Sequence, residues 1–160
     1  SIINGCSGDM FAYKESTVAQ IPVTEITNST LIKPQGRIFY AGNAASFSID
    51  YCTMYGWGGS KAMLELGDKN TLGMSLAIKN TILANGGSNR KAHNANAAAN
   101  LSLTIEKVYG TNDMTFHSTL GDVTKYDKPS TEVFENPEEG NFKIIDALFP
   151  SSIGDPRWKE

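Results

Sequence analysis

Isoleucine marks a pattern of hydrophobic and polar positions that repeats along the chain. The pattern is centred on Ile3, Ile26, Ile49, Ile78 and Ile105, which are 23, 23, 29 and 27 residues apart. Positions two before each isoleucine, and three and five after it, are mostly apolar or small, so they share one face of an extended chain. The position two after each isoleucine is an extra residue that breaks this alternation, and it indicates a bend between two strands. Asn28 and Asn80 occupy it, and Asn tolerates the left-handed conformation of a tight bend.

A second apolar run follows in each of the first three repeats, at residues 10–12, 38–40 and 63–66. Coils of this length with occasional insertions are typical of solenoids. We therefore predict an all-β fold, a right-handed parallel β-helix (β-solenoid) of about five coils over residues 1–120. Residues 121–160 are predicted to be a C-terminal capping segment of the same domain. The alternative is an antiparallel sandwich of short strands, against which the scarcity of tight hairpin signals counts.

The position after each isoleucine is predicted to face outward. It holds Asn4, Thr27, Asp50, Lys79 and Glu106, of which the last three alternate in charge. Stacked about 4.8 Å apart, such neighbours stabilise a sheet modestly.

Two cysteines, Cys6 and Cys52, fall at the same position of the repeat, with Ser29 between them. Two coil steps separate them by roughly 9–10 Å, which is too far for a disulfide. We expect two buried free thiols.

Length and charge exclude some classes of protein. The 160 residues are 40% hydrophobic, and 14 basic and 17 acidic residues give a net charge of −3, so nothing indicates a nucleic-acid partner. No apolar run approaches the roughly 20 residues of a transmembrane helix. Because the repeat begins at Ile3, the first coil lacks a cap, and we expect upstream coils of the same protein or another chain to cover it.

The C-terminal stretch reads V-F-E-N-P-E-E-G-N-F-K-I at 133–144 and G-D-P-R-W at 154–158. It resembles the closing segment of right-handed β-helix proteins that Bacteroidetes secrete to the cell surface, a domain-of-unknown-function family in the pectate-lyase-like superfamily. The resemblance implies an extracellular or outer-membrane location and a context of polysaccharide capture and breakdown. Its aromatic and apolar residues are expected to cover the last coil: Phe134, Phe142, Ile144 and Trp158.

Lyases on this fold use a lysine or arginine base and carboxylates that hold Ca²⁺. Here Asp50, Glu65 and Asp68 lack calcium-loop spacing, and His93 and His117 lack zinc-ligand spacing, so we expect no metal or other cofactor and assign no catalytic residue. The insertion at 88–94 concentrates Arg90, Lys91 and His93, and is our candidate for binding an anionic sugar. The alternative is a solvated loop without function.

Aromatic residues Tyr51, Tyr55 and Trp57 form the second candidate, because they lie beside glycines where the coil is longest. Sugar rings stack on such faces, although the rings could instead cover hydrophobic surface. The leading hypothesis is a non-catalytic or accessory cell-surface protein that binds complex polysaccharide. The alternatives are a pectate-lyase-like lyase or glycoside hydrolase with its active site on upstream coils, and a structural module of a surface assembly.

Overall fold

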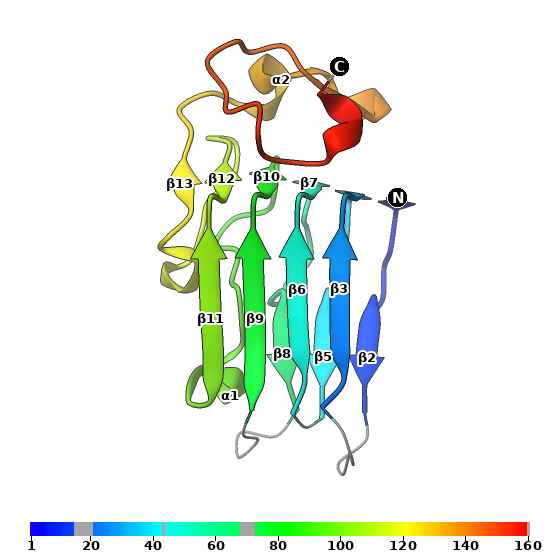
Figure 1. Cartoon of the computed structure of the whole chain (residues 1–160), viewed down its shortest axis with the longest axis vertical. Coiled ribbons are helices and arrows are strands. Elements are labelled where there is room, and N and C mark those ends of the chain that lie inside the picture. Colours follow the sequence, from blue (N-terminus) through cyan, green and yellow to red (C-terminus); the bar gives the residue numbers. More distant parts are fainter. Residues whose placement is uncertain (15–20, 43, 68–72, 160) are drawn as a thin grey trace.

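The computed structural model describes residues 1–14, 21–42, 44–67 and 73–159. Apart from one antiparallel pair near the C-terminus, its strands form three parallel sheets stacked as a β-solenoid (Figure 1). The six-stranded sheet contains, in spatial order, β1 (Ile2–Asn4), β4 (Thr30–Ile32), β7 (Thr53–Tyr55), β10 (Ile82–Ala84), β12 (Tyr109–Gly110) and β13 (Thr124–Lys125). The four-stranded sheet contains β3 (Val23–Thr27), β6 (Ser46–Asp50), β9 (Met74–Lys79) and β11 (Leu101–Glu106). The three-stranded sheet contains β2 (Phe11–Tyr13), β5 (Phe39–Ala41) and β8 (Leu64–Leu66).

These sheets confirm the all-β solenoid, and the antiparallel sandwich is wrong because every pair within the three sheets is parallel. Counted on the four-stranded sheet, the solenoid makes about four turns rather than about five. Its right-handedness and the boundary at residue 120 stay predictions. Two short helices, α1 (Ala95–Ala98) and η1 (Ser118–Leu120), lie between the later strands.

The predicted isoleucine register holds from the second repeat onward. Ile26, Ile49, Ile78 and Ile105 pair in sequence through β3, β6, β9 and β11. The bend after these strands, here called the first corner, has left-handed residues at every level: Asn28, Tyr51, Asn80 and Lys107, with φ of 48°, 50°, 44° and 52°. This corner turns the chain into the six-stranded sheet. The local pattern therefore encodes both the strand and its bend.

The first repeat is out of the predicted register, because Ile3 pairs with Leu31 rather than with Ile26. Gly5, at φ 69°, belongs to a second corner after the six-stranded sheet, together with Lys33, Gly56 and Asn85 at 50°, 69° and 44°. Both corners follow an apolar strand, so the spacing of apolar residues alone does not distinguish the first corner from the second. Cys6 and Cys52 are both free, as predicted, but they occupy different positions of the coil, and Cys6 is only half-buried.

The outward ladder runs through Thr27, Asp50, Lys79 and Glu106. Lys79 Nζ lies 3.5 Å from Glu106 Oε2, whereas the Asp50 carboxylate accepts from Asn80 Nδ2 at 2.8 Å. Asn4 lies opposite Ile32 and is not part of this ladder.

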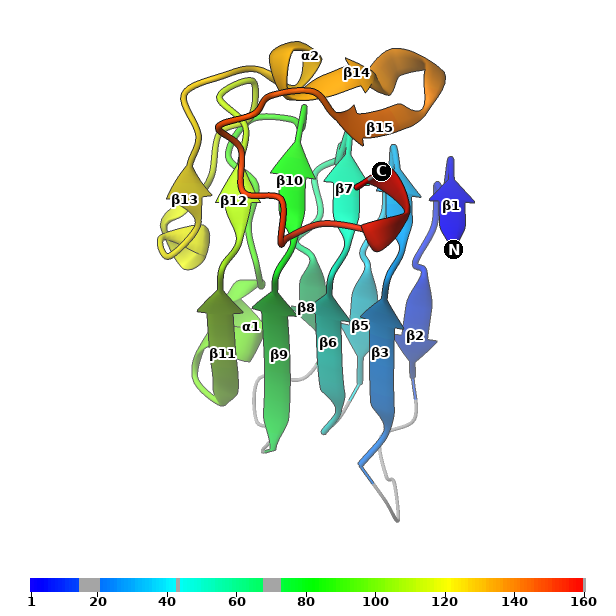
Figure 2. The ribbon, with the colours of Figure 1, turned by 45° about the horizontal axis from the view of Figure 1, so that its top comes forward.

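The C-terminal segment, residues 126–159, contains α2 (Ser130–Val133), β14 (Phe134–Asn136), η2 (Pro137–Glu139), β15 (Asn141–Ile144) and η3 (Pro156–Trp158). It contacts the last coil, where Phe149 packs on Tyr109, and it also runs back along the outer side of the six-stranded sheet (Figure 2). The reason is that this sheet has apolar outward residues, including Tyr55, Ile82 and Ala84, which the segment buries. Strands β7 and β10 are consequently buried on both faces. The capping role predicted for this segment stays a prediction.

Polar contacts fix the end of this segment across three coils. Gly154 N donates to Asn80 O at 2.7 Å, Asp155 N donates to Thr53 Oγ1 at 3.1 Å, and Trp158 Nε1 donates to Thr30 Oγ1 at 2.7 Å. Gly154 has φ +80°, and an added Cβ would lie 2.5 Å from Ile82 Cδ1 and 3.0 Å from Thr53 Oγ1. Only glycine fits this crossing without strain.

A half-buried carboxylate, that of Asp113, joins the last coil to α2. The Asp113 side chain accepts from the backbone N–H of Ser130 at 2.9 Å and from the hydroxyls of Ser130 and Thr111. Burial raises the pKa of Asp113, but the bonds from Ser130 and Thr111 outweigh it and hold that pKa below its usual value.

Strands β1, β2 and β3 pair on one side only, within the part of the chain that the structure describes. Ile2, Ile21 and Val23 beside this edge are 51%, 52% and 66% exposed. No helix in the described ranges is long and apolar enough to cross a bilayer.

Candidate functional site: a cationic hollow on the solenoid

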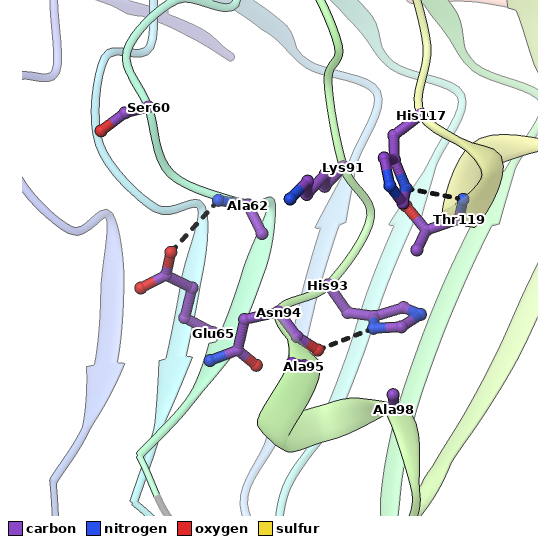
Figure 3. A pocket seen from close by; sticks show the side chains of 10 residues that line it. All are labelled: Ser60, Ala62, Glu65, Lys91, His93, Asn94, Ala95, Ala98, His117 and Thr119. Atoms are coloured by element: carbon purple, nitrogen blue, oxygen red, sulfur yellow. Dashed lines mark hydrogen bonds between the residues drawn. The ribbon is translucent and has the colours of Figure 1, made fainter.

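A hollow of about 310 Å³ lies beside the three-stranded sheet, where α1 and η1 project from the last coils (Figure 3). It is lined by Ser60, Ala62, Glu65, Lys91, His93, Asn94, Ala95, Ala98, His117 and Thr119. These residues come from three successive coils. The bridges Leu64–His93 and Arg90–Phe116 set the alignment of those coils.

Lys91 and His117 lie on adjacent coils, and their backbones are close together. His117 N donates to Arg90 O at 2.8 Å, beside the Arg90–Phe116 bridge. The Lys91 side chain is exposed, and its ammonium has no ion pair or hydrogen bond among the described residues. Ala92 between Lys91 and His93 is fully buried. Successive side chains of an extended chain point to opposite faces. Because Ala92 points into the interior, Lys91 and His93 point toward the surface.

Both imidazoles are fixed by hydrogen bonds at Nδ1. His93 Nδ1 lies 2.9 Å from Asn94 O. His117 Nδ1 accepts from Thr119 N at 3.2 Å and caps η1. Figure 3 shows both bonds. Each bond is made by Nδ1, so Nε2 of each ring takes no part in it.

The only carboxylate among the lining residues, Glu65, is already committed. Its oxygens accept from Ala62 N at 3.3 Å and Arg37 Nη1 at 3.4 Å, with Lys61 Nζ at 3.9 Å. Arg37 also pairs with Asp9 at 2.6 Å, and this bond chiefly raises the pKa of the Arg37 guanidinium. The unpaired charge facing the hollow is therefore the positive charge of Lys91.

Arg90 does not join Lys91 and His93 in the hollow. Its guanidinium donates to the carbonyl of Gly58 at 2.8 Å, of Ser88 at 2.9 and 3.1 Å, and of Gly59. Burial lowers its pKa. These bonds brace the insertion against the preceding coil.

The three aromatic candidates do not share a surface. Tyr55 points outward but is fully buried beneath the C-terminal segment, where its hydroxyl donates to Glu138; burial and this carboxylate raise the Tyr55 pKa to about 12. Trp57 is fully buried in the interior, and its indole N–H has no hydrogen-bond partner in the described part of the chain. Tyr51, 38% exposed at the first corner, has Lys159 Nζ 5.4 Å from its ring centroid. Buried rings offer no platform for sugar, so covering hydrophobic surface accounts for Tyr55 and Trp57.

Sequence reasoning missed His117 as a lining residue. The available signal was its separation of 26 residues from Lys91, which is about one coil. In the described ranges no three histidine, cysteine or acidic side chains are grouped to hold a metal ion.

Together these features define a parallel β-solenoid protein with a lateral C-terminal segment and a cationic surface hollow. The chain belongs to the family described as Domain of unknown function (DUF5123), which matches residues 47–158. That match begins in β6 and ends in η3, so it includes both the hollow and the lateral segment. Comparisons with curated proteins and with solved structures gave no match.

Proposed function

We propose that the protein is a non-catalytic module that binds acidic polysaccharide, with the carboxylate of one sugar unit held in the hollow. The observation that carries this proposal is that the unpaired Lys91 and the imidazoles of His93 and His117 line the same hollow. Charge-assisted bonds to carboxylates are stronger than neutral ones. The hollow, at about 310 Å³, is at the small end of ligand sites, which suits one sugar unit rather than a long segment.

The resemblance of the C-terminal segment to secreted Bacteroidetes β-helix proteins of the pectate-lyase-like superfamily supports a polysaccharide ligand. The same resemblance supports a location at the cell surface or outer membrane, which we propose with it. The aromatic platform is not part of the proposal, because Tyr55 and Trp57 are fully buried.

Affinity electrophoresis in gels containing polygalacturonate, with neutral galactan as the reference, tests this function. Lys91→Ala is expected to weaken retardation by polygalacturonate about tenfold, because it removes a charged hydrogen bond. Lys14→Ala, which removes an exposed lysine from the first coil, is the matched control and is expected to bind like the native protein. Equal retardation of Lys91→Ala and Lys14→Ala would refute the site. Release of unsaturated sugar products would instead support the lyase alternative.

The unpaired edge of the first coil favours a second candidate function, as a structural module that stacks on another β-coil. Exposed Ile2 and Val23 flank edge strands that have no neighbouring strand on their outer side among the described residues, and such an edge can pair with another coil. Light scattering tests this: Val23→Lys is expected to reduce self-association, since an edge charge opposes strand pairing. A native protein that stays monomeric at high concentration would argue against stacking between copies.

A further inference from the structure

The two histidines of the hollow are held by opposite kinds of hydrogen-bond partner. His93 Nδ1 faces the carbonyl of Asn94 at 2.9 Å, and a carbonyl can only accept. His117 Nδ1 faces the backbone N–H of Thr119 at 3.2 Å, and an amide N–H can only donate. The partner at Nδ1 sets the tautomer of a neutral imidazole. The His93 proton therefore lies on Nδ1, whereas the His117 proton lies on Nε2.

Opposite tautomers give the two free Nε2 atoms opposite roles. His117 Nε2–H is a donor, and His117 lies on the coil next to that of Lys91, beside the Arg90–Phe116 bridge. His93 Nε2 has a lone pair and can only accept. Other described titratable groups at this surface are the Glu65 carboxylate and Lys61, which pair with each other.

We propose that the hollow recognises a uronic acid unit through two different groups: Lys91 and His117 donate to the carboxylate, while His93 accepts from a hydroxyl of the same sugar. This inference rests on the proposed function and deepens it by naming the sugar class and the specificity residues. Each histidine is assigned to one ligand group. The two therefore contribute differently to selectivity for acidic over neutral sugar.

Titration calorimetry with trigalacturonate and with its neutral galactose counterpart separates these contributions. His117→Asn retains an N-cap acceptor for η1 but removes the imidazole. It is expected to lower affinity for the acidic sugar about tenfold and for the neutral sugar less than about twofold. His93→Ala is expected to lower both affinities by the same factor, about fivefold. A His93→Ala variant that weakens only acidic binding, or a His117→Asn variant that weakens both equally, overturns the proposal.

Imidazole ¹⁵N NMR of the ligand-free protein at mildly alkaline pH tests the tautomers without any sugar. We expect His93 to be protonated at Nδ1 and His117 at Nε2. Reversed tautomers with normal sugar binding refute this inference alone. The expected tautomers without binding of either sugar refute the proposed function, and with it the assigned ligand.

Discussion

Thr30→Val tests whether the C-terminal segment holds the coils of the solenoid together. The Thr30 side chain is fully buried in β4, and its hydroxyl makes two contacts with the segment. It donates to Asp155 Oδ2 at 2.7 Å and accepts from Trp158 Nε1 at 2.7 Å. Valine has nearly the same shape, so the substitution removes both bonds without opening a cavity. The Asp155 side chain, only 2% exposed, then loses a donor that water cannot replace.

The magnitude follows from the two bonds. A hydrogen bond to a charged acceptor contributes about 1.5–3 kcal/mol, and a neutral one about 1 kcal/mol. Thr30→Val should therefore lower the free energy of unfolding by about 3 kcal/mol. With a urea m-value of about 2 kcal/mol/M, the unfolding midpoint should fall by roughly 1.5 M.

Urea unfolding followed by circular dichroism measures this change, with Thr104→Val as the control. Thr104 is exposed on β11, so its substitution should shift the free energy by less than about 0.5 kcal/mol. Trp158→Phe should cost about 1 kcal/mol alone and almost nothing when combined with Thr30→Val, because both remove the same bond. A Thr30→Val midpoint close to that of Thr104→Val, or additive effects of the two changes, would refute the reasoning.

Three further substitutions and treatments test other parts of the structure. Gly154→Ala should lower the urea midpoint clearly, because Gly154 has a positive φ and the added Cβ would meet buried side chains. The control Gly8→Ala should leave the midpoint unchanged, because nothing lies within 4 Å of its added Cβ. Equal midpoints for the two variants would contradict the crossing geometry. Burial raises the pKa of Cys52 to about 11, so iodoacetamide at pH near 8 should label the half-buried Cys6 and spare Cys52, as read by peptide mass spectrometry. Asp113→Asn should lower the urea midpoint at neutral pH. Because the pKa of Asp113 is lowered in the fold, its contribution is present above about pH 4 and is lost as the pH falls further, so the gap from the native protein should narrow in acid.

The candidate site shows the limit of prediction from sequence. Lys91 and His93 were predicted as binding residues because they lie together in one insertion, and the structure places both at the hollow. Arg90, from the same insertion, instead braces backbone carbonyls, since the extended chain directs it away from its neighbour. His117 joins the site only through the stacking of the next coil. The composition of the sequence identifies an insertion rich in basic residues. The alignment of neighbouring coils, however, decides which of its side chains come together with those of other coils.

The sequence by itself determined the repeating coil of this protein. Alternation of inward isoleucines with outward polar residues, and left-handed residues such as Asn28 and Asn80 at the bend, specify strands and corners because these features depend on neighbouring residues only. The tertiary structure alone decided where residues 126–159 lie. Their packing on Tyr55 and Ile82 joins positions that are more than 40 residues apart. No local pattern states which outward apolar residues will be covered, and by which segment, so that choice appears only in the folded chain.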